Sequence, residues 1–406
     1  MKLSLLTLSS VVGFAVADFH PKLLRRGSPY SNEADILQFS NVGYDGFYYP
    51  VSKIEAVNAS ACSCSLDVDN PIKFSGPISP LDEELSVHLR GPVNLRKFAW
   101  YTTSSYSYKD TTGNWNRGAY FDAETGETSN VTFLGNVGTD NLCLGRALDY
   151  TDETGLEIAN SSTVLGNVTI PSSEEITIMS GVECEGDSCG VYRSDSKAYH
   201  GFYGVNKMFL FEFAAPSDLS EETLKNKTDG YDMTAIWLLN AQIPRTAQYP
   251  TNSDCSSWGS GSGEFDIFEI VNDTERTHFY STIHDFQGIE YISEGIQNYA
   301  YLERTPESVM KGGVIFGEDG TATVFLSNST TFDDSIANTD INSWLDALSG
   351  STHDETLLSI SVTPASSTAV SSIHSAKSNA AAGAAGDSIL GHFTTIFYII
   401  LGLLYV

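Results

Sequence analysis

The sequence predicts an all-β fold, either a sandwich or a barrel. Short segments rich in β-branched and aromatic residues recur along the chain, and Gly, Pro, Asn or Asp bounds each of them. Long segments with helical periodicity are few, and many short strands separated by turns are typical of sandwiches and barrels. In chain order, we expect strands over 85–92, 95–102, 131–137, 207–216, 233–240, 264–271, 278–284 and 321–327.

Two short helices and one boundary complete the predicted organisation. One helix is expected over 217–226, with Ser or Asp as its N-cap, and another over 339–350, ending at Gly350. A polar, turn-forming and aromatic segment over 102–119 marks a change in composition. We therefore expect an N-terminal β-rich domain over 37–104 and a larger β-sandwich domain over 105–350.

The N-terminal residues have the pattern of a secretory signal. Residues 1–17 contain one Lys, an apolar stretch and the small-residue pattern Ala15-Val16-Ala17, which together predict a cleaved signal peptide. Arg25-Arg26 is either a dibasic processing site, which would release a propeptide over 18–26, or a pair of surface arginines.

The C-terminal residues have the pattern of a lipid-anchor signal. An apolar tail over 393–406 follows a spacer of small residues, so residues 380–406 read as a GPI-anchor signal that is removed on maturation. The tail is shorter than the ~20 residues that a spanning helix needs. Asn379 is the preferred attachment residue, with Ser378 and Gly383 as alternatives. The Ser-, Thr- and Ala-rich segment 351–379 is predicted to be an O-glycosylated stalk.

Charge and cysteines restrict the partners and the compartment. A net charge of −29 disfavours nucleic acid and anionic membrane as partners, since both require clustered Lys and Arg. The even number of cysteines, six, predicts disulfides in an oxidising compartment; Cys184 and Cys189 could close a small loop, and the pairing is otherwise open. Predicted N-glycosylation sites are Asn58, Asn130, Asn160, Asn167, Asn226, Asn272 and Asn328.

Three carboxylates stand close together in "GSGEFDIFEIVND" (261–273). Alternate residues of a strand share a face, so Glu264 and Asp266 point the same way while Glu269 would point to the opposite face. A β-bulge at Ile267 or Phe268 adds one residue and restores the parity of Glu269. All three carboxylates then line one side of the strand, and its aromatic residues face the core.

This pattern suits acid/base chemistry. Two carboxyls ~5–5.5 Å apart serve a retaining glycosidase as nucleophile and acid/base. An Asp between them can hydrogen-bond the nucleophile and raise the pKa of the acid by repulsion. The alternative is an ordinary edge strand whose polar face meets water. That alternative must also explain the aromatic residues at 265 and 268 and the "GSGSG" loop that precedes the strand.

Neighbouring residues are candidates for sugar binding. The segment "HFYSTIH" follows through a short hairpin connection and places four polar side chains on one face. Trp and Tyr rings stack on sugars, while Asn, Gln and Arg bond their hydroxyls. Each Trp could instead be a core residue, and each His a satisfied or surface residue. The candidates are Trp237, Asn240, Gln242, Arg245, Trp258, His278, Tyr280, Thr282 and His284.

The segment "GEFDIFEI" resembles the active-site strand of glycoside hydrolase family 16 in its bulged E-x-D-x-x-E form. With "SGPISPLDEELSVHLRGP", "HGFYGVNKMFLFEFAAP" and "MTAIWLLNAQIPRTAQYP", the chain from about 70 to 330 resembles fungal Tos-type cell-wall glycosidases. The resemblance implies a concanavalin-like jelly-roll sandwich with a concave glucan cleft. It also implies Glu264 as nucleophile, Glu269 as acid/base, Asp266 as helper, and β-1,3-glucan as substrate.

One departure concerns the loop before the carboxylate strand. That group carries extra cysteines there, whereas this chain has Ser257 and Ser262 and leaves Cys255 without a local partner. The predicted protein is a secreted, GPI-anchored fungal cell-wall enzyme that hydrolyses or transglycosylates β-1,3-glucan with retention, without metal or cofactor. The alternatives are a non-catalytic wall protein that binds or cross-links glucan, and an adhesin.

Overall fold

The computed structural model describes residues 32–218, 230–348 and 350–364. The predicted signal peptide, propeptide and GPI-anchor signal, including Asn379, lie outside the described residues. So do the sequon at Asn226 and nearly all of the helix predicted over 217–226. In the described part of the chain, no helix is long and apolar enough to cross a membrane.

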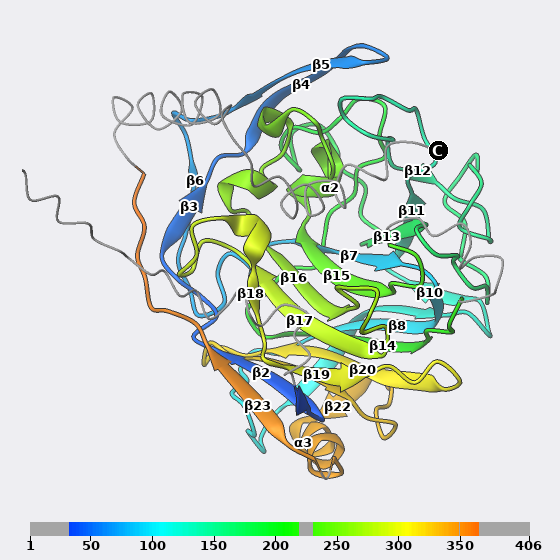
Figure 1. Cartoon of the computed structure of the whole chain (residues 1–406), viewed down its shortest axis with the longest axis vertical. Helices are drawn as coiled ribbons and strands as arrows, with labels where there is room; N and C mark the ends of the chain where they lie inside the picture. The colour runs from blue at the N-terminus through cyan, green and yellow to red at the C-terminus, as the bar shows by residue number, and fades with distance from the viewer. Residues whose placement is uncertain (1–31, 219–229, 349, 365–406) are drawn as a thin grey trace, which may run out of the picture.

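Two large β-sheets form the molecule, and the predicted all-β sandwich is confirmed (Figure 1). The first sheet contains, in spatial order, β1 (Asn32–Glu33), β19 (Ala300–Glu303), β17 (His278–His284), β16 (Glu264–Glu269), β15 (Ala235–Asn240), β7 (Leu85–Arg90), β13 (Glu175–Met179), β11 (Thr132–Gly135) and β12 (Asp149–Tyr150), with β18 (Ile296–Gln297) beside β17. The second contains β10 (Glu127–Ser129), β9 (Asn114–Asp122), β8 (Asn94–Thr102), β14 (Lys207–Ala214), β20 (Val309–Phe316), β21 (Ala322–Leu326), β2 (Ile36–Ser40) and β23 (Thr352–Thr356), with β22 (Ser335–Ala337) beside β9.

The smaller elements lie at the ends and on the outside of the sandwich. Each strand predicted from sequence is present. The helix predicted over 339–350 is present as α3 (Asn338–Asp346), which begins one residue earlier and ends before Gly350. Two-stranded sheets pair β3 (Gly46–Tyr48) with β6 (Ile72–Phe74) and β4 (Val51–Asn58) with β5 (Ala61–Leu66). The remaining short elements are α2 (Gln242–Thr246), η1 (Ser253–Cys255), η2 (Trp258–Ser260) and η3 (Ile292–Glu294).

The main core lies between the two sheets. Phe265 and Phe268 of β16 point inward, where Phe265 meets Phe39 of β2 at 5.6 Å and Phe316 of β20 at 5.5 Å between ring centroids. Phe268 stacks on Phe213 of β14 at 5.5 Å. Because burying one such side chain is worth about 1.5–3 kcal/mol, these rings fix which face of β16 is internal. The polar residues of β16 must therefore lie on the outer face.

Among the described elements, the longer of the two α-helices covers the second sheet, while the short helix α2 packs only at one end of the first sheet, through Ile243 against Trp237 and Leu239. Helix α3 packs on the second sheet, where Trp344 stacks over Phe325 and the Trp115 indole donates to Asn338 Oδ1 at 2.9 Å. Figure 1 shows α3 beside β22 and β23, away from β15, β16 and β17. Most of the outer face of the first sheet is therefore not covered by α3.

The N-terminal segment predicted as a separate domain, 37–104, supplies strands to both large sheets and also forms a hairpin at one end of the sandwich. β2, β7 and β8 lie inside the large sheets, whereas the β4–β5 hairpin projects from one end of the molecule (Figure 1). At the C-terminal side, β23 runs parallel to β2 and Leu357 is buried in the main core. The folded sandwich thus extends beyond residue 351, where the sequence predicts the stalk to begin.

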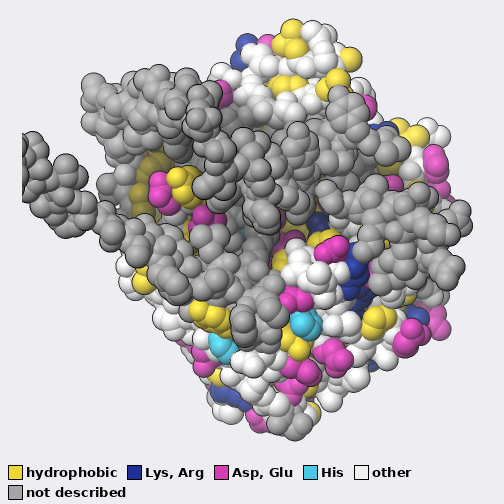
Figure 2. All heavy atoms as spheres, in the orientation of Figure 1, with side chains coloured by type: hydrophobic (Ala, Val, Ile, Leu, Met, Phe, Trp, Pro, Cys, Tyr) yellow, Lys and Arg dark blue, Asp and Glu magenta, His cyan; other side chains and the backbone are white. Residues whose placement is uncertain are grey.

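The surface is acidic, as the net charge of −29 requires. Figure 2 shows many Asp and Glu side chains and few Lys and Arg on the face it presents. Of the predicted N-glycosylation sites, Asn272 is partly buried. The exposed ones are Asn58, Asn130, Asn160, Asn167 and Asn328.

Candidate active site

The carboxylate strand carries the β-bulge that the sequence predicts. Asp266 is paired with Thr282 and Glu269 with Tyr280, so β16 uses one residue more than β17 over this stretch. The pairing with β15 shifts at the same place, where Phe268 is opposite Ile236 and Asp266 is opposite Trp237. The bulged residue is stabilised locally, because Ser281 Oγ donates to the Ile267 carbonyl at 2.6 Å.

The strand register aligns side chains of neighbouring strands in three rows on the outer face of the first sheet. Each row runs across β7, β15, β16 and β17, and the second and third also reach β13. The alternating residues Val87, Leu89, Ile236, Leu238 and Ile283 belong to the main core. The first row is Ser86, Leu239, Glu264 and His284; the second is Thr177, His88, Trp237, Asp266 and Thr282; the third is Glu175, Arg90, Ala235, Glu269 and Tyr280.

Glu264 has one strong hydrogen-bond donor and an unfavourable electrostatic setting. Trp258 Nε1 donates to Glu264 Oε2 at 2.6 Å. Burial, and then repulsion from Asp266, raise the pKa of Glu264 to about 8, against the lowering effects of His284 and the Trp258 bond. The sequence led us to expect such repulsion to act on the acid, Glu269. The structure shows it at Glu264, two residues from Asp266 on the same face.

Asp266 is paired with His284. The Nε2 atom of His284 lies 3.1 Å from Asp266 Oδ2, and its Nδ1 atom lies 2.7 Å from the Ile292 carbonyl oxygen at η3. A carbonyl oxygen only accepts, so Nδ1 carries a proton. An ionised Asp266 also only accepts, so it pairs best with the imidazolium form of His284. This contact balances charge beside Glu264.

Glu269 lies near a basic residue from a distant part of the sequence. Arg90 of β7 places a guanidinium nitrogen 3.7 Å from Glu269 Oε1, and its Nε donates to the Met233 carbonyl at 2.9 Å. In the same row, Glu175 accepts from the Tyr249 hydroxyl at 3.0 Å. Burial raises the pKa of Glu175, partly offset by Arg90. Carboxyl groups therefore stand on both sides of Arg90.

Trp237 forms the apolar middle of the face. It stacks on the His88 imidazole at 5.2 Å with an interplanar angle of 26°, and it packs with Leu239, Ile243 and Trp258. Only 4% of Trp237 is exposed. Burial lowers the pKa of His88 to about 3, so His88 is a neutral support that bonds Ser86 Oγ at 2.8 Å.

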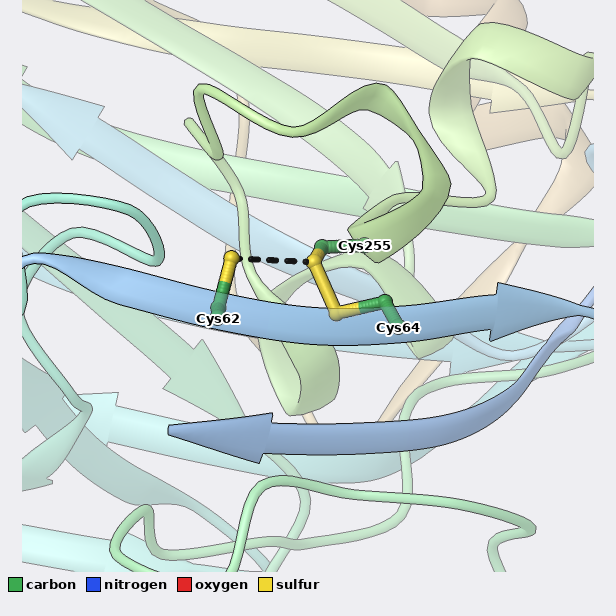
Figure 3. A group of neighbouring side chains, drawn as sticks. All are labelled: Cys62, Cys64 and Cys255. Carbon is green, nitrogen blue, oxygen red and sulfur yellow. Dashed lines mark hydrogen bonds between the residues drawn. A yellow bond between two sulfur atoms is a disulfide. The ribbon is translucent and has the colours of Figure 1, made fainter. Parts of the chain in front are cut away.

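The loop that carries Trp258 is held by the N-terminal segment. Ser260 Oγ donates to the Tyr49 carbonyl at 2.9 Å and accepts from the Tyr49 amide at 3.0 Å. Cys255 forms a disulfide with Cys64 of β5, which supplies the partner that the local sequence lacks (Figure 3). Gly261 and Gly263 have φ of +102° and +101°, a left-handed conformation that glycine adopts without strain.

Two further disulfides complete the set. Cys62 pairs with Cys143, and its sulfur lies 3.4 Å from that of Cys255 (Figure 3). The small loop expected between Cys184 and Cys189 is closed as predicted. Two groups of side chains that include these cysteines are close enough together to hold a metal ion. Because all of these cysteines are in disulfides, their sulfurs are not available as thiolate ligands.

The remaining sugar-binding candidates divide into two groups. Thr282, Tyr280 and His278 lie on the outer face beside β16; His278 stacks on Tyr301 at 3.6 Å, and Tyr280 is fully buried and donates to Glu275. Asn240, the last residue of β15, and Gln242 and Arg245 just beyond it contact other segments instead.

Asn240, Gln242 and Arg245 hold loops together. Asn240 Nδ2 donates to Glu83 Oε2 at 2.7 Å, and Gln242 Nε2 donates to the Tyr48 hydroxyl at 2.6 Å. Arg245 is 3% exposed and is ion-paired with Glu84. The structure does not bring these three side chains to the outer face with Glu264 and Glu269.

Among the residues of the face that were not identified from sequence are Arg90, Glu175, Tyr249 and Tyr301. A signal for Arg90 was present, because Ser86, His88 and Arg90 alternate with apolar residues in "LSVHLR". The other three had none, since only the pairing of distant strands brings them to the face.

Comparison with known proteins agrees with this picture. The family described as "Cell wall protein YJL171C/Tos1, C-terminal" matches residues 113–344, and its N-terminal counterpart matches residues 35–103. A Candida albicans protein named "Probable circularly permuted 1,3-beta-glucanase PGA52" is 47% identical over 78% of this chain and 83% of its own length. A Saccharomyces cerevisiae protein named "Probable circularly permuted 1,3-beta-glucanase YJL171C" is 44% identical over 82% and 86%. No solved structure matches significantly.

Proposed function

Because the chain belongs to the YJL171C/Tos1 family of cell wall proteins, we propose that it cleaves β-1,3-glucan with retention of configuration. The observation that carries the proposal is the bulge in β16, which aligns Glu264 and Glu269 on one outer face with Asp266 between them. The names of the relatives support the substrate class.

In the first step, Glu264 acts as the nucleophile and Glu269 as the acid. The Glu264 carboxylate attacks the anomeric carbon while Glu269 donates its proton to the glycosidic oxygen, and the bond between them breaks. A glycosyl ester on Glu264 forms and the shortened glucan leaves. Trp258, which donates to Glu264 Oε2, orients this carboxylate and favours its ionised form.

In the second step, the same residues act in reverse. Glu269, now a carboxylate, takes a proton from water or from a glucan hydroxyl, whose oxygen attacks the anomeric carbon and releases Glu264. Water gives hydrolysis and a glucan acceptor gives transglycosylation. We propose both outcomes for this site, in the remodelling of the cell wall.

The reactive form needs Glu264 ionised and Glu269 protonated. Burial and Asp266 disfavour the charge on Glu264, while Trp258 and His284 favour it. The helper role of Asp266 is therefore electrostatic: paired with His284, it sets how readily Glu264 loses its proton. The partly exposed His278–Tyr301 stack offers apolar surface to sugar rings in the same face, and the buried Trp237 packs with Trp258 as support.

We also propose that a GPI lipid attaches the protein to the membrane. This proposal rests on the sequence of residues 380–406 and on Asn379 as the attachment residue.

Product analysis on β-1,3-glucan oligosaccharides tests the proposed function. We expect the wild-type protein to produce shorter or elongated oligosaccharides, and Glu264→Gln to lose this turnover. Glu212→Gln is the matched control, because Glu212 lies on β14 of the second sheet in an ion pair with Lys311. Equal turnover by wild type and Glu264→Gln, or turnover by neither, would contradict the proposal and favour a non-catalytic glucan-binding protein.

A further inference from the structure

A cavity of about 340 Å³ opens at the end of β8 and the start of β14, in the second sheet. Small-molecule sites typically measure ~300–1,000 Å³, so the cavity is large enough for one small ligand. None of its residues belongs to the three rows around Glu264 and Glu269. Among those that line it are Trp100, Thr102, Thr103, Ser104, Tyr203 and Asn206.

Aromatic side chains form one wall of this cavity. Tyr203 is 65% exposed, more than any other large hydrophobic residue in the described part of the chain. Its ring lies 6.4 Å from that of Trp100, which rests on Phe202 at 5.3 Å. Gly118 leaves room for the Trp100 ring, because a Cβ at Gly118 would come within 2.5 Å of it. A buried Trp thus packs behind an exposed Tyr.

Neutral polar groups form most of the remaining lining, together with Gly204 and Val205. Thr102, Thr103 and Ser104 supply hydroxyls. Asn206 is fixed by Glu318, since Asn206 Nδ2 donates to Glu318 Oε2 at 3.1 Å and the Glu318 amide donates to Asn206 Oδ1 at 2.9 Å. No charged side chain is among the described residues that line the cavity. The lining therefore suits an uncharged ligand with many hydroxyls.

The indole nitrogen of Trp100 is buried beside the cavity. Trp100 Nε1 has no hydrogen-bond partner among the described residues. Buried donors without an acceptor are uncommon and often bond to a water or a ligand. The combination of an exposed aromatic ring, backed by the Trp100 indole, and neutral hydroxyls is the chemistry that recognises a pyranose ring, whose C–H face is apolar and whose edge is polar.

We propose that this cavity is a secondary binding site for a neutral sugar unit of the wall glucan, with Tyr203 as its stacking platform. The choice of β-1,3-glucan as ligand rests on the proposed function. The site holds the glucan polymer at the second sheet while another part of the same glucan molecule enters the face with Glu264 and Glu269. It should therefore matter for insoluble glucan and not for short soluble substrates.

Binding to insoluble β-1,3-glucan tests the proposal without relying on catalysis. The full-length protein carries Glu264→Gln in every arm, so that the polymer is not degraded, and depletion from solution is measured at increasing glucan. Tyr203→Ala should weaken binding by about 5- to 10-fold, the loss expected for one aromatic contact. Tyr203→Phe keeps the ring and should bind within about twofold of the parent. Ile158→Ala, at an exposed residue outside the cavity, should leave binding unchanged.

A second measurement separates this site from the proposed active site. In the catalytically intact background, Tyr203→Ala should turn over soluble oligosaccharides at the wild-type rate. Unchanged binding of Tyr203→Ala to insoluble glucan overturns the proposal, as does an equal loss of soluble turnover. If the wild type turns nothing over but binding still depends on Tyr203, the proposed enzymatic function fails and the secondary site stands.

Discussion

Trp258 donates a 2.6 Å hydrogen bond from its indole nitrogen to the Glu264 carboxylate, from a loop tied to the N-terminal segment at Ser260 and Cys255. The bond joins the proposed nucleophile to a residue outside its own strand. Because it favours the ionised form of Glu264, it opposes the burial that raises the pKa of this group.

Replacing Trp258 by Phe should therefore impair Glu264 without removing the aromatic ring. A charge-assisted hydrogen bond contributes about 1.5–3 kcal/mol, so kcat/KM should fall by roughly 10- to 100-fold. Loss of the donor also raises the pKa of Glu264, which moves the acid limb of the pH profile to higher pH. A pH–kcat/KM profile measures both effects, and a limb that stays in place contradicts the assigned bond.

Asp266→Asn should move the same limb in the opposite direction. In the free protein, Glu264 must be ionised to attack, so kcat/KM rises as pH increases through the pKa of Glu264, about 8. Repulsion by Asp266 raises this pKa more than His284 lowers it, so an uncharged Asn shifts the limb to lower pH. A shift to higher pH would show that the pairing with His284 is the larger effect of Asp266.

Glu264→Gln should stabilise the protein at alkaline pH. The folded-state pKa of Glu264, about 8, lies above its ordinary value of 4.5, so folding is disfavoured progressively as pH rises from 4.5 to 8. Gln removes the penalty, and the Tm of the variant should exceed that of the wild type by several degrees at pH 8.5 and equal it near pH 4. Glu212→Gln should show no such gain. A Tm at or below the wild-type value at pH 8.5 contradicts the electrostatic assignment.

The Cys64–Cys255 disulfide should affect both stability and activity. It closes 191 residues, whereas Cys184–Cys189 closes 5, and loop entropy predicts a difference of about 3 kcal/mol in the two losses. Replacing both Cys64 and Cys255 by Ala should lower Tm and reduce kcat/KM, because the Trp258 loop loses its tie to β5. The matched double variant at Cys184 and Cys189 should keep its activity. Equal losses of activity in the two variants would show that the tie has no specific role.

The sequence predicted the local features of the fold and the site. Alternation in 264–271 was enough to assign one face of the strand to the core and to require a bulge for Glu269, because both follow from the geometry of a single strand. The strands themselves were also predicted from local features, namely segments of β-branched and aromatic residues bounded by turn residues. Their order in the sheets was not, since it depends on contacts between distant residues.

The residues that the sequence analysis missed, or assigned to the wrong place, also depend on contacts between distant parts of the chain. Arg90 reaches Glu269 only because β7 pairs with β15, far along the chain. Arg245 has the chemistry of a sugar ligand, yet Glu84 pairs with it in the interior. Cys255 lacked a local partner, and the β4–β5 hairpin provides one. The alternation in "LSVHLR" places Arg90 on one face of its strand, but which distant segment each of these residues meets cannot be read from the sequence.

The configuration of the first-formed product tests the central claim most directly. Proton NMR during early turnover of a β-1,3-glucan oligosaccharide distinguishes the two anomers before they interconvert. With Glu264 as nucleophile and Glu269 as acid/base on one face, the new reducing end should appear first as the β-anomer. Initial release of the α-anomer would show inversion and would contradict the assignment of these two residues.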